Sequence, residues 1–112
     1  MGIWDRLRKG RRERTDAARP LTNEAFADHL QNFVDTRWGV EAWVEEAQKF
    51  ARPSILLVAF DGEFTRRQVP SETWAYRWAD ARGIPAHRAG VVPYPQRMRD
   101  HIAREKARRR RQ

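Results

Sequence analysis

The spacing of apolar residues predicts an amphipathic helix early in the chain. Over residues 23–37, one face collects the large apolar side chains at positions i, i+4, i+7 and i+8: Phe26, Leu30, Phe33 and Val34. The opposite face is polar or charged. This pattern is typical of a helix that packs one stripe against a core and exposes the rest.

The next clear pattern is a β-hairpin. Two strand-like runs flank Asp61-Gly62, a dipeptide that tolerates the two positive φ angles of a type I′ turn. Ile55–Phe60 is apolar at every position, which predicts a strand buried on both faces at the centre of a sheet. The returning run, Glu63–Val69, is rich in polar residues, so it should show a face or an edge to water.

The segment VEAWVEEAQKFA, between the helix and the hairpin, fits two kinds of element. A helical face would hold Val40, Trp43, Val44 and Ala47, whereas a strand face would hold Val40, Ala42 and Val44. Periodicity alone favours the helix. Both interpretations stay open on the pattern.

A second helix is predicted over residues 71–82, with Ser71 as its N-cap and Gly83 at its end. The stretch IPAHRAGVVPYP then reads as a last, irregular strand, because its proline and glycine residues interrupt regular pairing.

A terminal helix should begin with Pro95 in its first turn. Tyr94, Met98 and Ile102 stand four apart and can pack on the body for about two turns. No large apolar residue follows Ala103, so the ARRRRQ end should project into solvent.

Charge divides the chain into three parts. Residues 1–20 carry a net charge of +4, residues 21–94 carry −2 and residues 95–112 carry +6, within a total of +8. We therefore expect a basic N-terminal arm and linker (1–20), a globular domain (21–94) and a basic C-terminal helix with an arginine tail (95–112).

Length and composition narrow the class of protein. A chain of 112 residues with 40% hydrophobic residues forms one folded domain. It has no cysteine, which excludes disulfides and thiolate sites, and its longest apolar run is too short to span a membrane. We expect a cytoplasmic α+β protein, with a mixed or antiparallel sheet of three to four strands, two packed helices and the basic C-terminal helix.

Three segments together resemble a group of short uncharacterised actinobacterial proteins: FVDTRWGVEAWVEE, LLVAFDGEFTRR and GIPAHRAGVVPYPQRMRDH. The resemblance covers about residues 33–101 and rests on a GVEA-like segment, a DGE-aromatic-TRR hairpin and a terminal YPQRMRD. It implies a strand over residues 40–46, with QKFARP as a connecting loop. It implies no activity and no catalytic residue.

The concentration of arginine in the two ends points to a polyanionic partner. Planar guanidinium groups suit phosphates, and a run of four consecutive arginines suits counterion release from a nucleic acid. The candidate nucleic-acid-binding residues are Arg97, Arg99, Arg104, Lys106, Arg108, Arg109, Arg110, Arg111, Arg6, Arg8, Lys9, Arg11 and Arg12. The hypothesis is a non-catalytic accessory protein that contacts RNA or a ribonucleoprotein without sequence specificity, because no sequence-reading motif is present.

Aromatic side chains next to arginine would strengthen an RNA interface, because bases stack on them. The candidates are Trp38 and Trp43, near Arg37, and Tyr94, near Arg97. In so small a domain, the competing interpretation is that these rings belong to the core.

Two alternatives compete with RNA binding. The first is an adaptor that meets an anionic membrane through Ile3, Trp4 and Leu7, or that meets a protein partner or a second copy of the chain. The second is a degenerate nuclease, since the order of elements is similar to the core of restriction-endonuclease-like enzymes. Asp61 and Glu63 would be its acids, but the lysine of that family's Glu-x-Lys motif is replaced by Thr65. No cofactor, metal or small-molecule substrate is expected.

Overall fold

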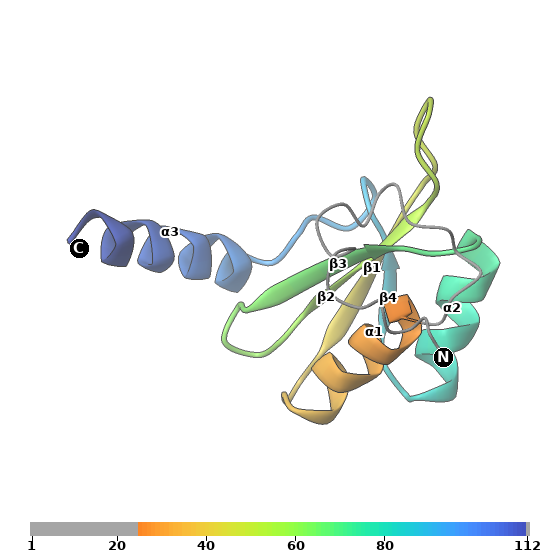
Figure 1. Ribbon diagram of the computed structural model, residues 1–112, viewed down its shortest axis with the longest axis horizontal. Coiled ribbons are helices and arrows are strands. Elements are labelled where there is room, and N and C mark those ends of the chain that lie inside the picture. The colour runs from red at the N-terminus through yellow and green to blue at the C-terminus, as the bar shows by residue number, and fades with distance from the viewer. Residues whose placement is uncertain (1–24, 112) are drawn as a thin grey trace, which may run out of the picture.

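The computed structural model describes residues 25–111, which form an α+β domain (Figure 1). The elements follow in the order α1 (Ala25–Asp35), β1 (Glu41–Glu45), β2 (Ser54–Val58), β3 (Phe64–Gln68), α2 (Glu72–Ala81), β4 (Ala86–Arg88) and α3 (Gln96–Arg110). The predicted fold class is confirmed. The predicted N-terminal arm lies outside the described residues.

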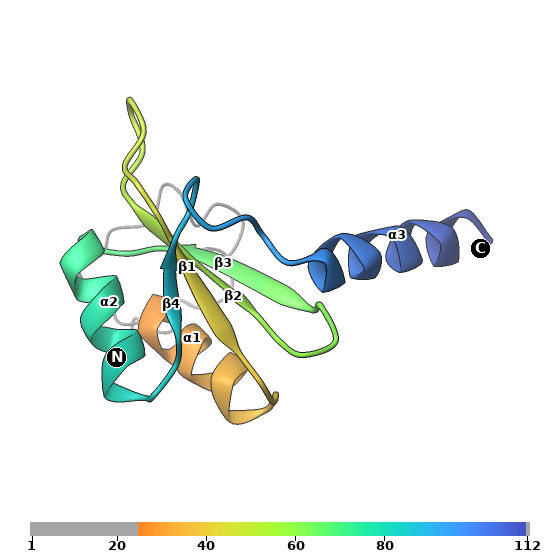
Figure 2. The ribbon, with the colours of Figure 1, turned by 180° about the vertical axis from the view of Figure 1, so that it is seen from behind.

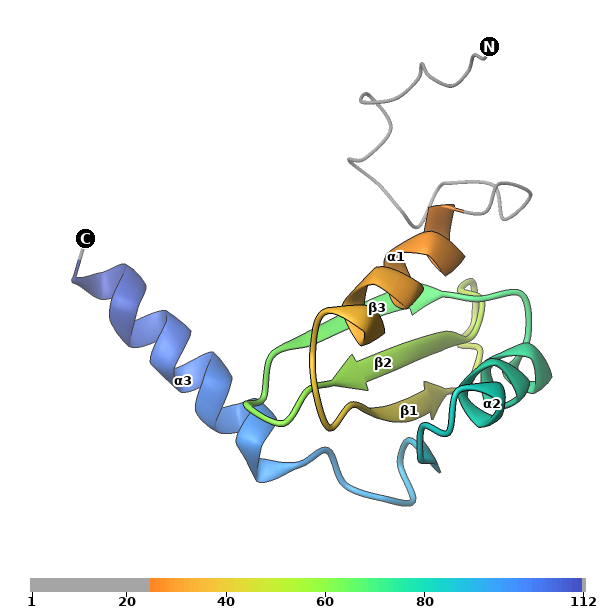
Figure 3. The same ribbon diagram turned by 90° about the horizontal axis from the view of Figure 1, so that it is seen from below.

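The strands form one mixed sheet in the order β3-β2-β1-β4. β2 pairs antiparallel with both β1 and β3, while β1 pairs parallel with β4. The parallel pair is possible because α2 carries the chain from β3 back across to the far edge of the sheet (Figure 3). The interior position predicted for the run at residues 55–60 is confirmed for β2, and β3 is an edge strand as its polar residues indicated.

Helices α1 and α2 both pack on one face of the sheet and close the main core. Ile55 and Leu57 of β2 meet Leu30 and Phe33 of α1 and Trp78 of α2, and all five are buried. The apolar stripe predicted for the first helix is therefore the stripe that it buries.

Residues 41–45 are a strand, so the helical interpretation of this segment is wrong. Ala42 and Val44 point into the main core, while Trp43 between them is buried on the opposite face. A strand with apolar residues on both faces has no polar alternation, which is why its pattern resembled a helical stripe. The segment 46–53 is a projecting loop with an isolated bridge between Gln48 and Ala51.

The opposite face of the sheet has a smaller apolar cluster that holds the start of α3. Trp43, Leu56 and Val58 bury Met98, with Tyr94 and Ile102 packed partly against them. The predicted packing of the first two turns of the terminal helix is confirmed. Beyond this cluster α3 leaves the domain (Figure 2).

The hairpin turn between β2 and β3 differs from the type I′ turn that Asp61-Gly62 suggested. In the described chain no residue other than glycine has a positive φ, so Asp61 cannot adopt the first angle of that turn. Instead, the Gly62 N–H donates to the Ala59 carbonyl at 3.0 Å, and Gly62 alone takes a positive φ of 94°. Five residues, 59–63, separate β2 from β3, and the Ala59 N–H donates to the Glu63 carbonyl at 2.8 Å. The turn inside this bond has three residues, one more than predicted, and Phe60 is the first of them instead of part of the strand.

Helix boundaries follow the predicted signals closely. The Ser71 hydroxyl accepts the Trp74 N–H at 3.0 Å and caps α2, and Gly83 follows the end of α2 with a φ of 68°. Pro95 stands at the N-cap of α3, one position before the first turn in which the sequence placed it.

Gly62 fixes the hairpin tip against α3. A Cβ added at Gly62 would lie 1.9 Å from the Arg97 carbonyl oxygen and 2.9 Å from the His101 Cβ. The first contact is with backbone, so it cannot be relieved by a side-chain rotation. Only glycine therefore permits this approach.

We predict that Gly62→Ala separates this close approach from the cost of a positive φ. Gly90→Ala is the matched control, because Gly90 has a φ of 89° and nothing within 4 Å of an added Cβ. Both variants should lose about 1–2 kcal/mol through backbone strain. Gly62→Ala should lose a further 1–3 kcal/mol or so through overpacking, measured by urea unfolding. Equal losses would contradict the tight junction.

Candidate nucleic-acid interface

The last two turns of α3 carry cations that the domain does not neutralise. Lys106, Arg109, Arg110 and Arg111 are exposed, and within residues 25–111 no hydrogen bond or ion pair joins their side chains to the body. The helix stands away from the sheet in this region (Figure 2). The positive charge of these four side chains is therefore available to an anionic group outside the described domain.

Arg97, the first of the predicted binding residues, is instead part of the domain. Its Nε donates to the Ala59 carbonyl at 2.9 Å, and its Nη2 pairs with the Glu41 carboxylate at 3.2 Å. The same carboxylate bonds His87 Nε2 at 2.8 Å. These contacts hold the first turn of α3 to the ends of β1 and β2, so Arg97 has a positioning role in the structure.

Three arginines between Arg97 and the end of α3 have partners close by, namely Arg99, Arg104 and Arg108. Arg99 bonds Gln96 within its own helix, and Arg104 Nη2 donates to the backbone carbonyl of Asp61 at 2.8 Å. Arg108 pairs with Glu105 three residues earlier. The partners of Arg99 and Arg104 are neutral groups, so the charges of these two side chains are not cancelled.

The remaining predicted cations lie outside the described residues. They are Arg6, Arg8, Lys9, Arg11 and Arg12. The membrane-contact residues Ile3, Trp4 and Leu7 lie there as well.

The three aromatic candidates differ in how far they are buried. Trp43 is a core residue, with its indole N–H donating to the Val92 carbonyl at 3.0 Å. Tyr94 is half-buried and donates its hydroxyl to Glu45. Trp38 is 77% exposed. Trp38 alone among the three presents its ring to solvent.

Phe60 is an exposed aromatic residue that the sequence assigned to the buried central strand. It is 63% exposed, and its ring lies 6.2 Å from that of Trp38. β2 ends at Val58, two residues earlier than the apolar run. The available signal was its position next to the Asp61-Gly62 turn, since a residue that enters a turn leaves the pleat of the strand.

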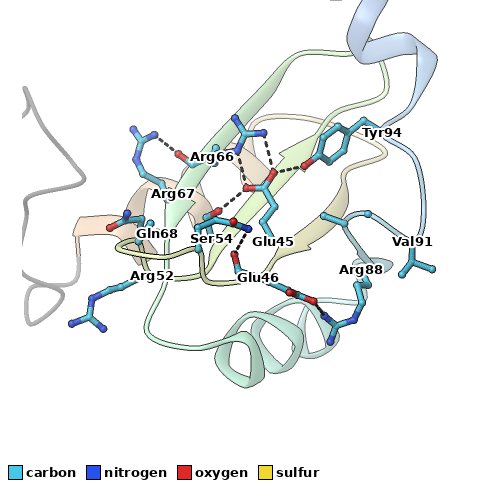
Figure 4. A pocket seen from close by; sticks show the side chains of 14 residues that line it. Glu45, Glu46, Arg52, Ser54, Arg66, Arg67, Gln68, Arg88, Val91 and Tyr94 are labelled. Atoms are coloured by element: carbon cyan, nitrogen blue, oxygen red, sulfur yellow. Dashed lines mark hydrogen bonds and ion pairs between the residues drawn. The ribbon is translucent and has the colours of Figure 1, made fainter.

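A polar groove of about 840 Å³ lies at the other end of the sheet (Figure 4). It is bounded by the β1–β2 loop, the end of β3 and the segment that follows β4. Six charged side chains line it: Glu45, Glu46, Arg52, Arg66, Arg67 and Arg88.

Glu45 is the centre of this groove. Its Oε1 accepts from Ser54 at 2.6 Å and from Arg66 Nε at 2.8 Å, and its Oε2 accepts from Arg66 Nη2 at 2.9 Å and from Tyr94 at 2.5 Å (Figure 4). Burial by itself would raise the pKa of the Glu45 carboxyl. The hydrogen bonds from Arg66, Ser54 and Tyr94 outweigh that effect and hold the pKa below its usual value.

This arrangement suits a structural latch better than a catalytic base. A general base needs a free lone pair and a pKa near the working pH, whereas both oxygens of Glu45 are engaged and its pKa is lowered. The bonds join β1, β2, β3 and the connection to α3 in one network. The pKa of the Tyr94 hydroxyl is raised, by burial and by its bond to Glu45, so Tyr94 remains a donor.

The two acids of the nuclease hypothesis are also committed to structural contacts. Glu63 pairs with Arg37 at 2.6 Å, and this hydrogen bond lowers the pKa of the Glu63 carboxyl. Asp61 Oδ1 accepts the Glu63 backbone N–H at 3.0 Å, as in many turns. In the described part of the chain, no three side chains of His, Asp or Glu gather into a group that could hold a metal ion.

We predict that Glu45→Gln weakens the fold in a pH-dependent way. At pH 7 it should lower the free energy of unfolding by about 2 kcal/mol, because Arg66 and Tyr94 lose a charged acceptor. A carboxyl whose pKa is lowered by folding stabilises the native state above its unfolded pKa of about 4.3, and this contribution is lost as the pH falls through the folded pKa. The difference between variant and parent should therefore shrink below about pH 4 in urea titrations.

The matched control for this prediction is Glu46→Gln, the next residue but on the open rim of the groove. Glu46 pairs with Arg88 at 3.0 Å, and 60% of its side chain is exposed. Such a pair contributes less than about 1 kcal/mol. Comparable losses in the two variants would argue against the latch.

Comparison with protein-family models, with curated proteins and with solved structures finds no match to this chain. No helix among residues 25–111 combines the length and the apolar character needed to cross a bilayer.

Proposed function

We propose that this protein is a non-catalytic RNA-binding module that holds the phosphate backbone with the free half of α3. Residues 104–111 carry six cations and one acid, on a helix whose first half is fixed to the sheet. The domain acts as the support and the helix as the contact surface. This contact would take place in the cytoplasm, on RNA alone or in a ribonucleoprotein.

The observation that carries the proposal is the separation of charge in space. The globular part is slightly acidic, and among the described residues a single ion pair, at the first turn of α3, links this helix to the sheet. If these arginines only kept the protein soluble, they would not need to lie on an ordered helix. Here the cations lie on a regular helix that the domain holds at a fixed angle, which supports a defined binding surface.

Helical geometry gives this surface an arrangement suited to a polyanion. Successive residues rise 1.5 Å and turn about 100° around the axis, so Arg108–Arg111 surround the helix within about 5 Å of its length. Such a cluster releases counterions from any closely spaced row of phosphates, whatever the base sequence. Guanidinium groups add forked hydrogen bonds to each phosphate. Binding should be strong at low salt and indifferent to sequence.

We predict that changing Arg109, Arg110 and Arg111 together to Gln makes RNA binding weaker and less dependent on salt. Each lost phosphate contact lowers the slope of log K against log salt by about 0.7 for a single strand, so the slope should fall by about 2. Fluorescence anisotropy with a labelled RNA between about 50 and 200 mM salt would measure it.

The control removes the same number of positive charges from another part of the domain. Lys49, Arg52 and Arg77 are exposed on the domain, and changing all three to Gln lowers the net charge equally. This control should leave the slope within experimental error of the parent value, because a general effect of net charge is screened at these distances. Equal effects in the two triple variants would contradict a binding site on α3. Retention of the parent protein by anionic vesicles but not by RNA would favour the membrane adaptor instead.

A further inference from the structure

The structure holds an aromatic surface beside α3, and we propose that it stacks unpaired bases of the same RNA strand whose phosphates α3 binds. The surface is formed by Trp38 and Phe60, and the ligand is single-stranded RNA. This inference rests on the proposed function and adds to it a preference for unpaired over paired strands.

The surface is ordered as well as exposed. Trp38 is 77% exposed and Phe60 is 63% exposed, and their rings are tilted by 53° at a centroid distance of 6.2 Å. The Phe60 N–H donates to the Trp38 carbonyl at 3.0 Å, which joins the α1–β1 loop to the hairpin tip. Gly39 has a φ of 56°, and an added Cβ there would lie 3.1 Å from the Phe60 Cβ. Backbone contacts therefore hold the two rings together without burying them.

The same hairpin tip touches α3 on its other side. The backbone carbonyl of Asp61 accepts a hydrogen bond from the Arg104 guanidinium. Gly62 lies against the Arg97 carbonyl oxygen and the His101 Cβ. Residues 60–62 therefore bridge the aromatic pair and the basic helix. Figure 3 shows the hairpin tip, the α1–β1 loop and the first turns of α3 at one end of the sheet.

The face of α3 that touches the tip continues outward as a row of cations. Arg104, Arg108 and Arg111 stand at i, i+4 and i+7, so they share one face of the helix. Along the axis, Arg108 lies about 6 Å beyond Arg104, and Arg111 about 10 Å beyond it. A strand whose phosphates follow this row reaches the hairpin tip at its inner end.

Charges near the aromatic pair favour a base over a phosphate at that position. Arg37 is paired with Glu63, and the Asp61 carboxylate lies at the tip itself. A phosphate there would meet this carboxylate, whereas a neutral base would meet the two rings. The phosphates then belong on α3 and the base on the aromatic surface, as in single-strand binding proteins that combine a basic track with stacking rings.

Stacking on an exposed ring requires a base that is free of its own helix. In a duplex the bases stack on each other, so their faces are covered, and a protein meets only the backbone, the 2′-hydroxyls and the base edges. RNA presents unpaired bases in loops, bulges and ends. The aromatic surface thus predicts a preference for single strands, which α3 by itself would not produce.

The test compares two probes with three variants in salt-matched anisotropy titrations. The probes are a mixed-sequence RNA of about 12 nucleotides, within the usual site size, and the same strand annealed to its complement. Trp38→Ala should bind the single strand about tenfold more weakly, the loss expected for one stacked base, and should bind the duplex as the parent does. Trp38→Tyr, which keeps an aromatic face, should retain most of the affinity.

Phe50→Ala is the matched control, because Phe50 is 97% exposed on the loop at the opposite end of the sheet. It should leave both affinities unchanged. Unfolding midpoints should stay at the parent value in all three variants, since none of the replaced rings is in the core.

Several outcomes would overturn the inference, and they are separable from failure of the proposed function. Unchanged single-strand affinity in Trp38→Ala, with binding still lost in the α3 triple variant, would remove the stacking surface and leave the phosphate site standing. An equal loss for single strand and duplex would show that Trp38 does not contact bases. A parent protein that binds neither probe at low salt would overturn both proposals. Self-association that Trp38→Ala abolishes, without an effect on RNA, would assign the surface to a dimer contact.

Discussion

The contact between the β2–β3 hairpin tip and the first turns of α3 fixes the position of this helix relative to the sheet. Gly62 allows backbone to meet backbone, Met98 fills the apolar cluster beneath, and Arg97 joins the Ala59 carbonyl to the Glu41 carboxylate. Apolar burial gives this junction its strength, and the hydrogen bonds of Arg97 give it a direction. Without it, a helix with so many like charges would have little reason to stay ordered beside the sheet.

The two ends of the sheet differ in how their side chains are partnered. At one end, the network around Glu45 ties three strands to the segment before α3, and both carboxylate oxygens of Glu45 are engaged within the domain. At the other end, Trp38 and Phe60 leave apolar surface uncovered, and α3 carries charge away from the body. Phe50 is exposed at the first end as well, but the two neighbouring exposed rings and the unneutralised cations of α3 lie at the second end. The proposed binding depends on this combination.

Local sequence patterns predict the structure correctly where one physical preference dominates. The buried run that became β2, the Ser71 cap and the packing of Met98 each follow from a local pattern with few alternatives. Such patterns do not predict the conformation of residues at which two distant elements come into contact. The three-residue turn at Gly62 and the exposure of Phe60 depend on the approach of α3, which is about 35 residues further along the chain.

The sequence by itself determined the fold class, the two helical stripes and the location of positive charge at the end of the chain, because these depend on residue type and spacing. The tertiary structure decided which of the charged and aromatic residues are available. Arg97 and Trp43 look like binding residues in the sequence but are used within the domain, whereas Trp38 is left open. Availability depends on which partners the fold brings within hydrogen-bonding or van der Waals distance, and residues distant in sequence supply most of those partners.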